Sequence, residues 1–313
     1  MKEVEHDISL LHEHIIRTLL YYDIFNYPLK AEEVFRFLGT SHADQPFIRH
    51  ELEHLASQRL IFRFGDFFSI QNNEDNIMRR TKGNQEAERY LILARRKAKL
   101  IARFPFVRAV LASGSLSKGY MDESSDLDFF IITHPGRLWI ARMLLVMYKR
   151  IFLLNSYKYF CVNYFVDTEH LEIEEKNLFT ATELATVIPL YGAEFYHELL
   201  EGNRWLLKFF PNYKPRSSDE VPANRPGGMK KFMESCINVM GGNRIERYFM
   251  QKTLQRWMNV YGKKYDRQDF EVAFKTKNHA SKNHPRHYQK KIITLYLQKV
   301  KEYSQKFNLS WEV

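Results

Sequence analysis

Apolar residues recur at helical spacing in the first part of the chain. In residues 7–22 the apolar side chains fall three and four positions apart, which predicts an amphipathic helix that ends near Asn26-Tyr27-Pro28. The same spacing predicts a second helix over 31–39 and a third over 47–60. The chain therefore begins with three short helices.

A hairpin pattern follows these helices. Two β-rich runs, 60–64 and 67–70, are joined by Gly65-Asp66, a typical turn sequence. Three helices followed by a hairpin resemble a winged-helix domain over residues 5–72, and we take 1–72 as the first domain.

The third helix of such a domain enters the major groove of DNA. Here that helix would present Arg49, His50, His54 and Gln58, together with the acidic residues Glu51 and Glu53. Because the surface is only weakly basic, a protein-contacting or architectural winged helix remains open beside a DNA reader.

Strand and helix patterns alternate in the middle of the chain. Residues 72–83 are polar and predict a linker before a long helix over 85–103. The elements expected next are strands over 107–112, 127–132 and 159–166, and a helix over 138–154. These patterns predict a small mixed-sheet α/β (α+β) core over 84–170.

The remaining residues, 171–313, predict a C-terminal helical region. Helical patterns dominate from 172 to 210, with an interruption near Pro189, and return over 229–263 and 288–307. Proline and glycine residues predict an exposed linker near 211–228 between them.

Composition narrows the class of protein. No apolar run approaches the roughly 20 residues of a membrane-spanning helix. The N-terminus has no signal-peptide pattern, so we expect a soluble, cytoplasmic protein without membrane contact. The two cysteines, Cys161 and Cys236, lack the spacing of a zinc site or disulfide framework.

The net charge of +10 favours polyanionic partners. Between Lys275 and Lys306 there are nine basic residues and one acid, Glu302. The residues suited to phosphate contact and base stacking are Lys275, Lys277, Lys282, Arg286, Lys290, Lys291 and Tyr288. Nucleic-acid binding through this region, and an ordinary solvated helix flank, both remain open.

One short stretch combines two features of phosphate chemistry. A buried strand leads to Gly114-Ser115, where the missing Cβ lets backbone N–H groups approach a ligand and the serine adds a hydroxyl. Further on, Asp126 and Asp128 lie two apart at the start of a strand, so they project from one face about 6 to 7 Å apart. Either half alone is common, whereas the combination points to divalent cations at a phosphate cradle.

These residues resemble the signature of the DNA polymerase β-like nucleotidyltransferase superfamily, over residues 107–133. The resemblance implies that Gly114 and Ser115, with Lys118 in the same loop as a further candidate, hold the phosphates of a nucleoside triphosphate such as ATP. It implies that Asp126 and Asp128 hold Mg²⁺, or Mn²⁺ in its place. The implied reaction transfers a nucleoside monophosphate to an acceptor hydroxyl and releases pyrophosphate.

The family's third carboxylate, on a later strand, is not clearly matched. Asn163 holds the natural central position, and Asp167 lies four residues further on. Three interpretations stay open: Asp167 serves as the catalytic acid, which we favour slightly; Asn163 suffices as a weak metal ligand; or the site binds nucleotide without efficient transfer.

Two functions follow from these patterns. The first is a metal-dependent nucleotidyltransferase whose acceptor, base preference and oligomeric state the sequence does not decide. The second is a nucleotide-sensing, DNA-binding regulatory protein with a degenerate nucleotidyltransferase core.

Overall fold

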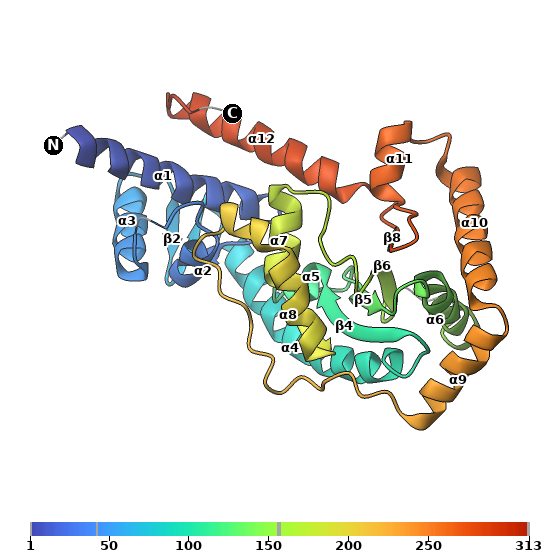
Figure 1. Cartoon of the computed structure of the whole chain (residues 1–313). Helices are drawn as coiled ribbons and strands as arrows, with labels where there is room; N and C mark the ends of the chain where they lie inside the picture. Colours follow the sequence, from blue (N-terminus) through green and yellow to red (C-terminus); the bar gives the residue numbers. More distant parts are fainter. Residues whose placement is uncertain (1, 42, 155–157, 312–313) are drawn as a thin grey trace.

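The N-terminal unit contains the three expected helices and the expected hairpin. The computed structural model describes residues 2–41, 43–154 and 158–311 (Figure 1). The elements of this unit are α1 (Lys2–Asp23), β1 (Leu29–Lys30), α2 (Ala31–Arg36), α3 (Gln45–Ser57), β2 (Phe62–Phe64) and β3 (Phe67–Ser69). The hairpin gains a third strand, because β1 pairs antiparallel with β3 and gives the order β1-β3-β2.

Helix α3 shows why these segments become helical. The side chain of Asp44 accepts a hydrogen bond from the backbone N–H of Phe47, and Pro46 occupies the first turn, where its missing N–H costs nothing. Ile48, Leu52 and Leu55 then bury the face of the helix that packs in the unit. The opposite face of α3 remains exposed.

The linker predicted over residues 72–83 is mostly helix. Helix α4 (Asp75–Ile101) begins ten residues before the predicted start at 85. The first turns of α4 are stabilised by tertiary contacts, which the polar sequence of this segment does not predict. The buried guanidinium of Arg80 donates to the carbonyl of Pro28 and forms an ion pair of 2.7 Å with Glu33. Burial of these partners favours helix over linker.

The central sheet contains strands from both the middle and the end of the chain. Its order is β7-β4-β5-β6-β8, and β5 and β6 are parallel while the other pairs are antiparallel. The strands are β4 (Val107–Ser113), β5 (Asp128–Thr133), β6 (Cys161–Asp167), β7 (Ile188–Tyr191) and β8 (Ala280–Lys282). The expected mixed α/β architecture is therefore present.

Both edge strands come from the region that we expected to be helical, and the sequence analysis predicted neither of them. Pro189, which marked an interruption between helices, lies inside β7. Proline is tolerated there because an edge strand leaves one side of its backbone unpaired. Strand β8 is only three residues long, too short to show an alternating pattern.

Helices cover both faces of the central sheet. They are α5 (Gly114–Ser117), α6 (Leu138–Phe152), α7 (Leu178–Thr186), α8 (Ala193–Gly202), the 3-10 helix η1 (Arg204–Lys208), α9 (Gly228–Val239), α10 (Gly242–Tyr261), α11 (Arg267–Ala273) and α12 (Tyr288–Lys306). Alternate residues of β4 and β5 point to opposite faces. Val110 and Phe129 pack with α4 and α6, whereas Leu111 and Phe130 share a core with α7, α8 and the N-terminal unit.

The N-terminal unit and the C-terminal helix are in contact. Figure 1 shows α12 running alongside α1, and Lys299 of α12 forms an ion pair of 2.6 Å with the buried Asp23 of α1. Between η1 and α9, residues 209–227 contain no helix or strand, as the predicted linker requires. Within the described residues, no helix has the length and apolar character needed to cross a membrane.

Candidate functional site

The Gly-Ser turn and Asp128 are brought together by the pairing of β4 with β5. Ser113, the last residue of β4, lies opposite Asp128, the first residue of β5. Gly114 then turns the chain with a φ of 64°, which favours glycine. A Cβ at this position would overlap the carboxylate oxygen Oδ2 of Asp128. The absence of a side chain at Gly114 is therefore what allows the turn to approach the acid.

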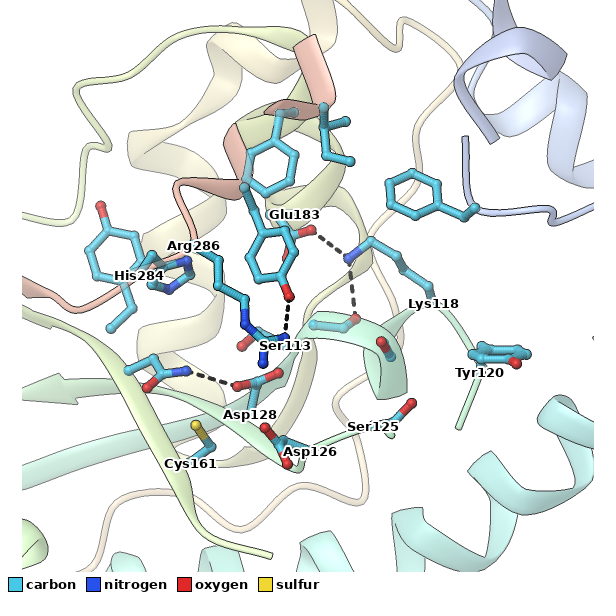
Figure 2. Close-up of a pocket in the computed structure, with 18 of the residues that line it drawn as sticks. Ser113, Lys118, Tyr120, Ser125, Asp126, Asp128, Cys161, Glu183, His284 and Arg286 are labelled. Atoms are coloured by element: carbon cyan, nitrogen blue, oxygen red, sulfur yellow. Dashed lines mark hydrogen bonds and ion pairs between the residues drawn. The ribbon is translucent and has the colours of Figure 1, made fainter. Parts of the chain in front are cut away.

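Asp126 and Asp128 lie side by side at the floor of a cleft (Figure 2). Burial, with a smaller contribution from the neighbouring charge of Asp126, raises the pKa of Asp128 to about 7, although a hydrogen bond with Cys161 acts in the opposite direction. A carboxyl group with this pKa is poorly solvated in its charged form. It therefore gains most from a cation that enters the cleft.

The neighbouring strand β6 places two neutral groups against Asp128. Cys161 is its partner in the parallel register, and burial raises the pKa of this thiol well above its ordinary value. The pairing then shifts by one residue, so that Asn163 is the extra residue of a β-bulge. Its side-chain N–H donates to Oδ1 of Asp128 at 2.9 Å. The sequence predicted Asn163 at the central position of this strand, and the bulge directs its side chain toward Asp128.

Asp167 does not belong to this site, which corrects the assignment that we favoured from the sequence. It pairs with Thr133, five residues beyond Asp128, which is about 16 Å along a strand. Its buried carboxylate accepts hydrogen bonds from the backbone N–H of Glu169 at 3.1 Å and from His170 at 2.8 Å. Alternation along β6 suggested a shared face, but the strand carries Asp167 to the opposite end of the sheet.

The side chain of Lys118 is held next to the Gly-Ser loop by two contacts. Its ammonium group donates to the carbonyl of Gly114 at 3.1 Å and forms an ion pair of 2.5 Å with Glu183 of α7 (Figure 2). The backbone carbonyl of Lys118 accepts a hydrogen bond of 3.0 Å from the hydroxyl of Tyr27, which comes from the N-terminal unit. Glu183 and Tyr27 are site residues that the sequence motif did not reveal.

The cleft has a volume of about 950 Å³ and is bounded by three parts of the chain. The N-terminal unit contributes Phe25 and Tyr27, and α7 contributes Phe179. The segment before α12 contributes Arg286, and α12 itself begins with Tyr288 at the cleft. Ser115 lines the cleft beside the turn at Gly114. A cleft of this size accommodates a ligand as large as a nucleotide.

Several basic residues of the C-terminal region fall into two groups. Lys282 and Arg286 line the cleft, together with the aromatic side chain of Tyr288. Lys275 pairs with Glu174 and Glu175, Lys277 pairs with Glu174, and Lys290 pairs with Asp269. The second group is therefore largely neutralised, and the continuous basic surface expected from the sequence is reduced.

The metal-ligating set is small. Over the described ranges, no group of three or more His, Cys, Asp or Glu side chains is arranged to hold a metal ion. Mg²⁺ is commonly held by one or two carboxylates together with substrate phosphates and water. Asp126 and Asp128 meet that minimum at the edge of the Gly114 cradle, so the residues fit a cation that arrives with a phosphate ligand.

Helix α3 presents a mixed surface. Arg49, His50 and His54 are exposed, as is Glu53, which pairs with Arg63 of the hairpin at 3.1 Å. The opposed charges leave no continuous basic stripe on the described residues of this helix.

Comparison of the chain with protein-family models, with curated proteins and with solved structures finds no match.

Proposed function

We propose that this protein is a metal-dependent nucleotidyltransferase. The observation that carries the proposal is the contact of the Gly114 turn with Asp128, beside Asp126, at the floor of a nucleotide-sized cleft. An acceptor hydroxyl attacks the α-phosphorus of a nucleoside triphosphate. A new O–P bond forms, the bond to the bridging oxygen breaks, pyrophosphate leaves and the hydroxyl proton passes to water.

Each group at the floor of the cleft has a place in this reaction. Asp126 and Asp128 would hold Mg²⁺, which supplies charge stabilisation at the reacting phosphate. Gly114 leaves room for phosphate oxygens and Ser115 offers a hydroxyl donor. Lys118 exchanges Glu183 for phosphate, because both are anionic partners of the same ammonium group.

The order of elements supports the same assignment. The Gly-Ser turn follows β4, and the two acids lie just before and at the start of β5, the neighbouring strand of a mixed sheet, as in polymerase β-like nucleotidyltransferases. The N-terminal unit has the succession helix, strand, two helices and two strands that is typical of a winged helix. We infer a nucleotidyltransferase core preceded by a winged helix.

Pyrophosphate release tests the proposal. The full chain is incubated with each nucleoside triphosphate, Mg²⁺ or Mn²⁺, and RNA, DNA, protein and small-molecule hydroxyl acceptors. We expect turnover with one acceptor class and a loss of about 10² to 10³-fold in Asp126→Asn and Asp128→Asn. Glu123→Gln, an exposed acid outside the cleft, is the matched control. Nucleotide binding without turnover by any acceptor would remove the enzyme proposal.

The second candidate is a nucleotide-sensing regulatory protein with a degenerate core. The amide of Asn163, which occupies the side of Asp128 where an acid would complete the site, favours it. In that case the protein binds nucleotide without releasing pyrophosphate and binds duplex DNA through α3. A duplex titration that shows neither sequence preference nor a steep salt dependence would argue against this candidate.

A further inference from the structure

The segment between β8 and α12 forms one wall of the cleft and is fixed to the sheet. The backbone N–H of Asn283 donates to the carbonyl of Asn163 at 3.0 Å, directly beside the metal-ligating edge. The N–H of His284 donates to the carbonyl of Ala273 at 2.9 Å, and the hydroxyl of Tyr265 donates to the carbonyl of Pro285. These bonds hold residues 283–287 over the reaction centre.

Arg286 is the side chain that this segment directs into the cleft. Figure 2 shows it extending from the C-terminal segment toward Asp128 and Asp126. One N–H of its guanidinium donates to the hydroxyl of Tyr288 at 2.9 Å, which orients the group. The residue is exposed, and within the described part of the chain no carboxylate lies at ion-pair distance from it.

Two other cations near Arg286 already have partners. Lys290 pairs with Asp269 at 2.7 Å. Lys282 is buried, and its ammonium group donates to the side chain of Gln289 at 3.2 Å. Arg286 is thus an oriented cation of the C-terminal segment that faces the proposed metal-ligating acids and keeps donors available.

We propose that Arg286 binds the β- and γ-phosphates of the nucleoside triphosphate and stabilises the departing pyrophosphate. The inference rests on the proposed function of the same cleft. A guanidinium presents a planar set of donors that matches two phosphate oxygens at once. Cations held by Asp126 and Asp128 offset the charge of those acids, which leaves the guanidinium to the phosphates. Because Asn163 is neutral, the centre has fewer anionic groups to hold cations, and a fixed guanidinium supplies positive charge there.

The proposal is tested by how binding depends on the number of phosphates. The full chain and its Arg286→Gln and Arg286→Lys variants are titrated with the tri-, di- and monophosphate of the nucleoside that the wild type prefers, with Mg²⁺ present. We expect Arg286→Gln to weaken triphosphate binding about 10- to 100-fold. Monophosphate binding should change by less than about twofold, since it lacks the contacted groups. Arg286→Lys should fall between, because lysine keeps the charge and loses the paired geometry.

Lys290→Gln is the matched control, because this cation lies close in sequence and is paired outside the cleft. Equal losses for the tri- and monophosphate in Arg286→Gln, or no loss for the triphosphate, would overturn the proposal. A loss confined to the KM of a phosphate-bearing acceptor would assign the guanidinium to the acceptor and overturn it as well. If the wild type binds no nucleoside triphosphate, the proposed function fails together with this inference, whereas failure in the variant alone leaves the proposed function standing.

Discussion

Replacement of Asp128 by asparagine should stabilise the fold at alkaline pH. The folded protein holds the pKa of Asp128 at about 7, against an ordinary value of 3.8, mainly because the carboxylate is desolvated. The folded state therefore keeps a proton between about pH 4 and 7 that the unfolded chain has lost. Because the folded state binds more protons there, the free energy of unfolding falls as pH rises through this range and is level above about pH 7.

The size of the effect follows from the two pKa values. The difference between 3.8 and about 7 corresponds to about 4 kcal/mol, at about 1.4 kcal/mol for each pH unit. The side chain retains some solvent contact, so we expect about 2 kcal/mol. The amide that replaces the carboxyl group in the variant stays neutral at every pH. Its carbonyl oxygen can still accept the 2.9 Å hydrogen bond from Asn163.

Urea denaturation followed by circular dichroism measures this difference. The wild type and Asp128→Asn are compared at about pH 5, 6, 7 and 8 in the presence of a chelator, and other titrating groups cancel in the comparison. Part of the full effect is already present at about pH 5, so we expect the variant to gain about 1 kcal/mol relative to the wild type between about pH 5 and 8. Mg²⁺ at about ten times its Kd should then stabilise the wild type by about 1.4 kcal/mol at about pH 8 and leave the variant unchanged. A difference between the two proteins that does not vary with pH would refute the reasoning.

Three further substitutions probe the same centre. Asn163→Asp should destabilise the metal-free fold by up to about 4 kcal/mol, because it adds a further carboxylate to the pair formed by Asp126 and Asp128. Mg²⁺ should reverse the loss; denaturation with and without Mg²⁺ checks this, and an unchanged midpoint would contradict it. Gly114→Ala should lower the free energy of unfolding by about 1 to 3 kcal/mol and abolish triphosphate binding, because the added Cβ meets the carboxylate of Asp128 and the residue has a φ of 64°. A calorimetric titration that finds wild-type affinity for the triphosphate would exclude phosphate binding at this turn. Tyr27→Phe removes the 3.0 Å hydrogen bond to the carbonyl of Lys118, so triphosphate affinity should fall about threefold to tenfold while the thermal midpoint of unfolding changes little. A triphosphate affinity equal to that of the wild type would show that this hydrogen bond does not position the Gly-Ser loop.

Local patterns predicted the elements and the floor of the site. Gly114 directly follows β4, which pairs antiparallel with β5, and Asp128 begins β5. The Gly-Ser and Asp-x-Asp motif of the resemblance therefore predicted residues that the structure brings together. The alternation of side chains along a strand gave a wrong prediction for Asp167. Alternation identifies the face of the strand on which a residue lies, but it does not give the distance between two residues along the strand. The bulge that aims Asn163 at Asp128 is a feature of pairing and leaves no signal in the sequence.

The walls of the site could not be predicted in the same way. Glu183 and Arg286 come from segments far along the chain, and only the folded topology brings them to the Gly-Ser loop. The edge strands β7 and β8 were missed because one contains a proline and the other has three residues. The early turns of α4 were predicted as a linker because the segment is polar. The contacts of Arg80 with the N-terminal unit, which polarity does not indicate, stabilise these turns as helix.

The N-terminal unit contacts two walls of the cleft. It contacts the Gly-Ser loop through the bond from Tyr27 to Lys118, and it contacts the helix that follows Arg286 through the ion pair of Asp23 with Lys299. Leu60, at the start of the hairpin, also accepts a bond of 2.7 Å from the hydroxyl of Tyr303 in that helix. These contacts join segments that lie far apart in the sequence. The N-terminal unit therefore helps to fix both the Gly-Ser loop and the helix that follows Arg286 in the folded protein.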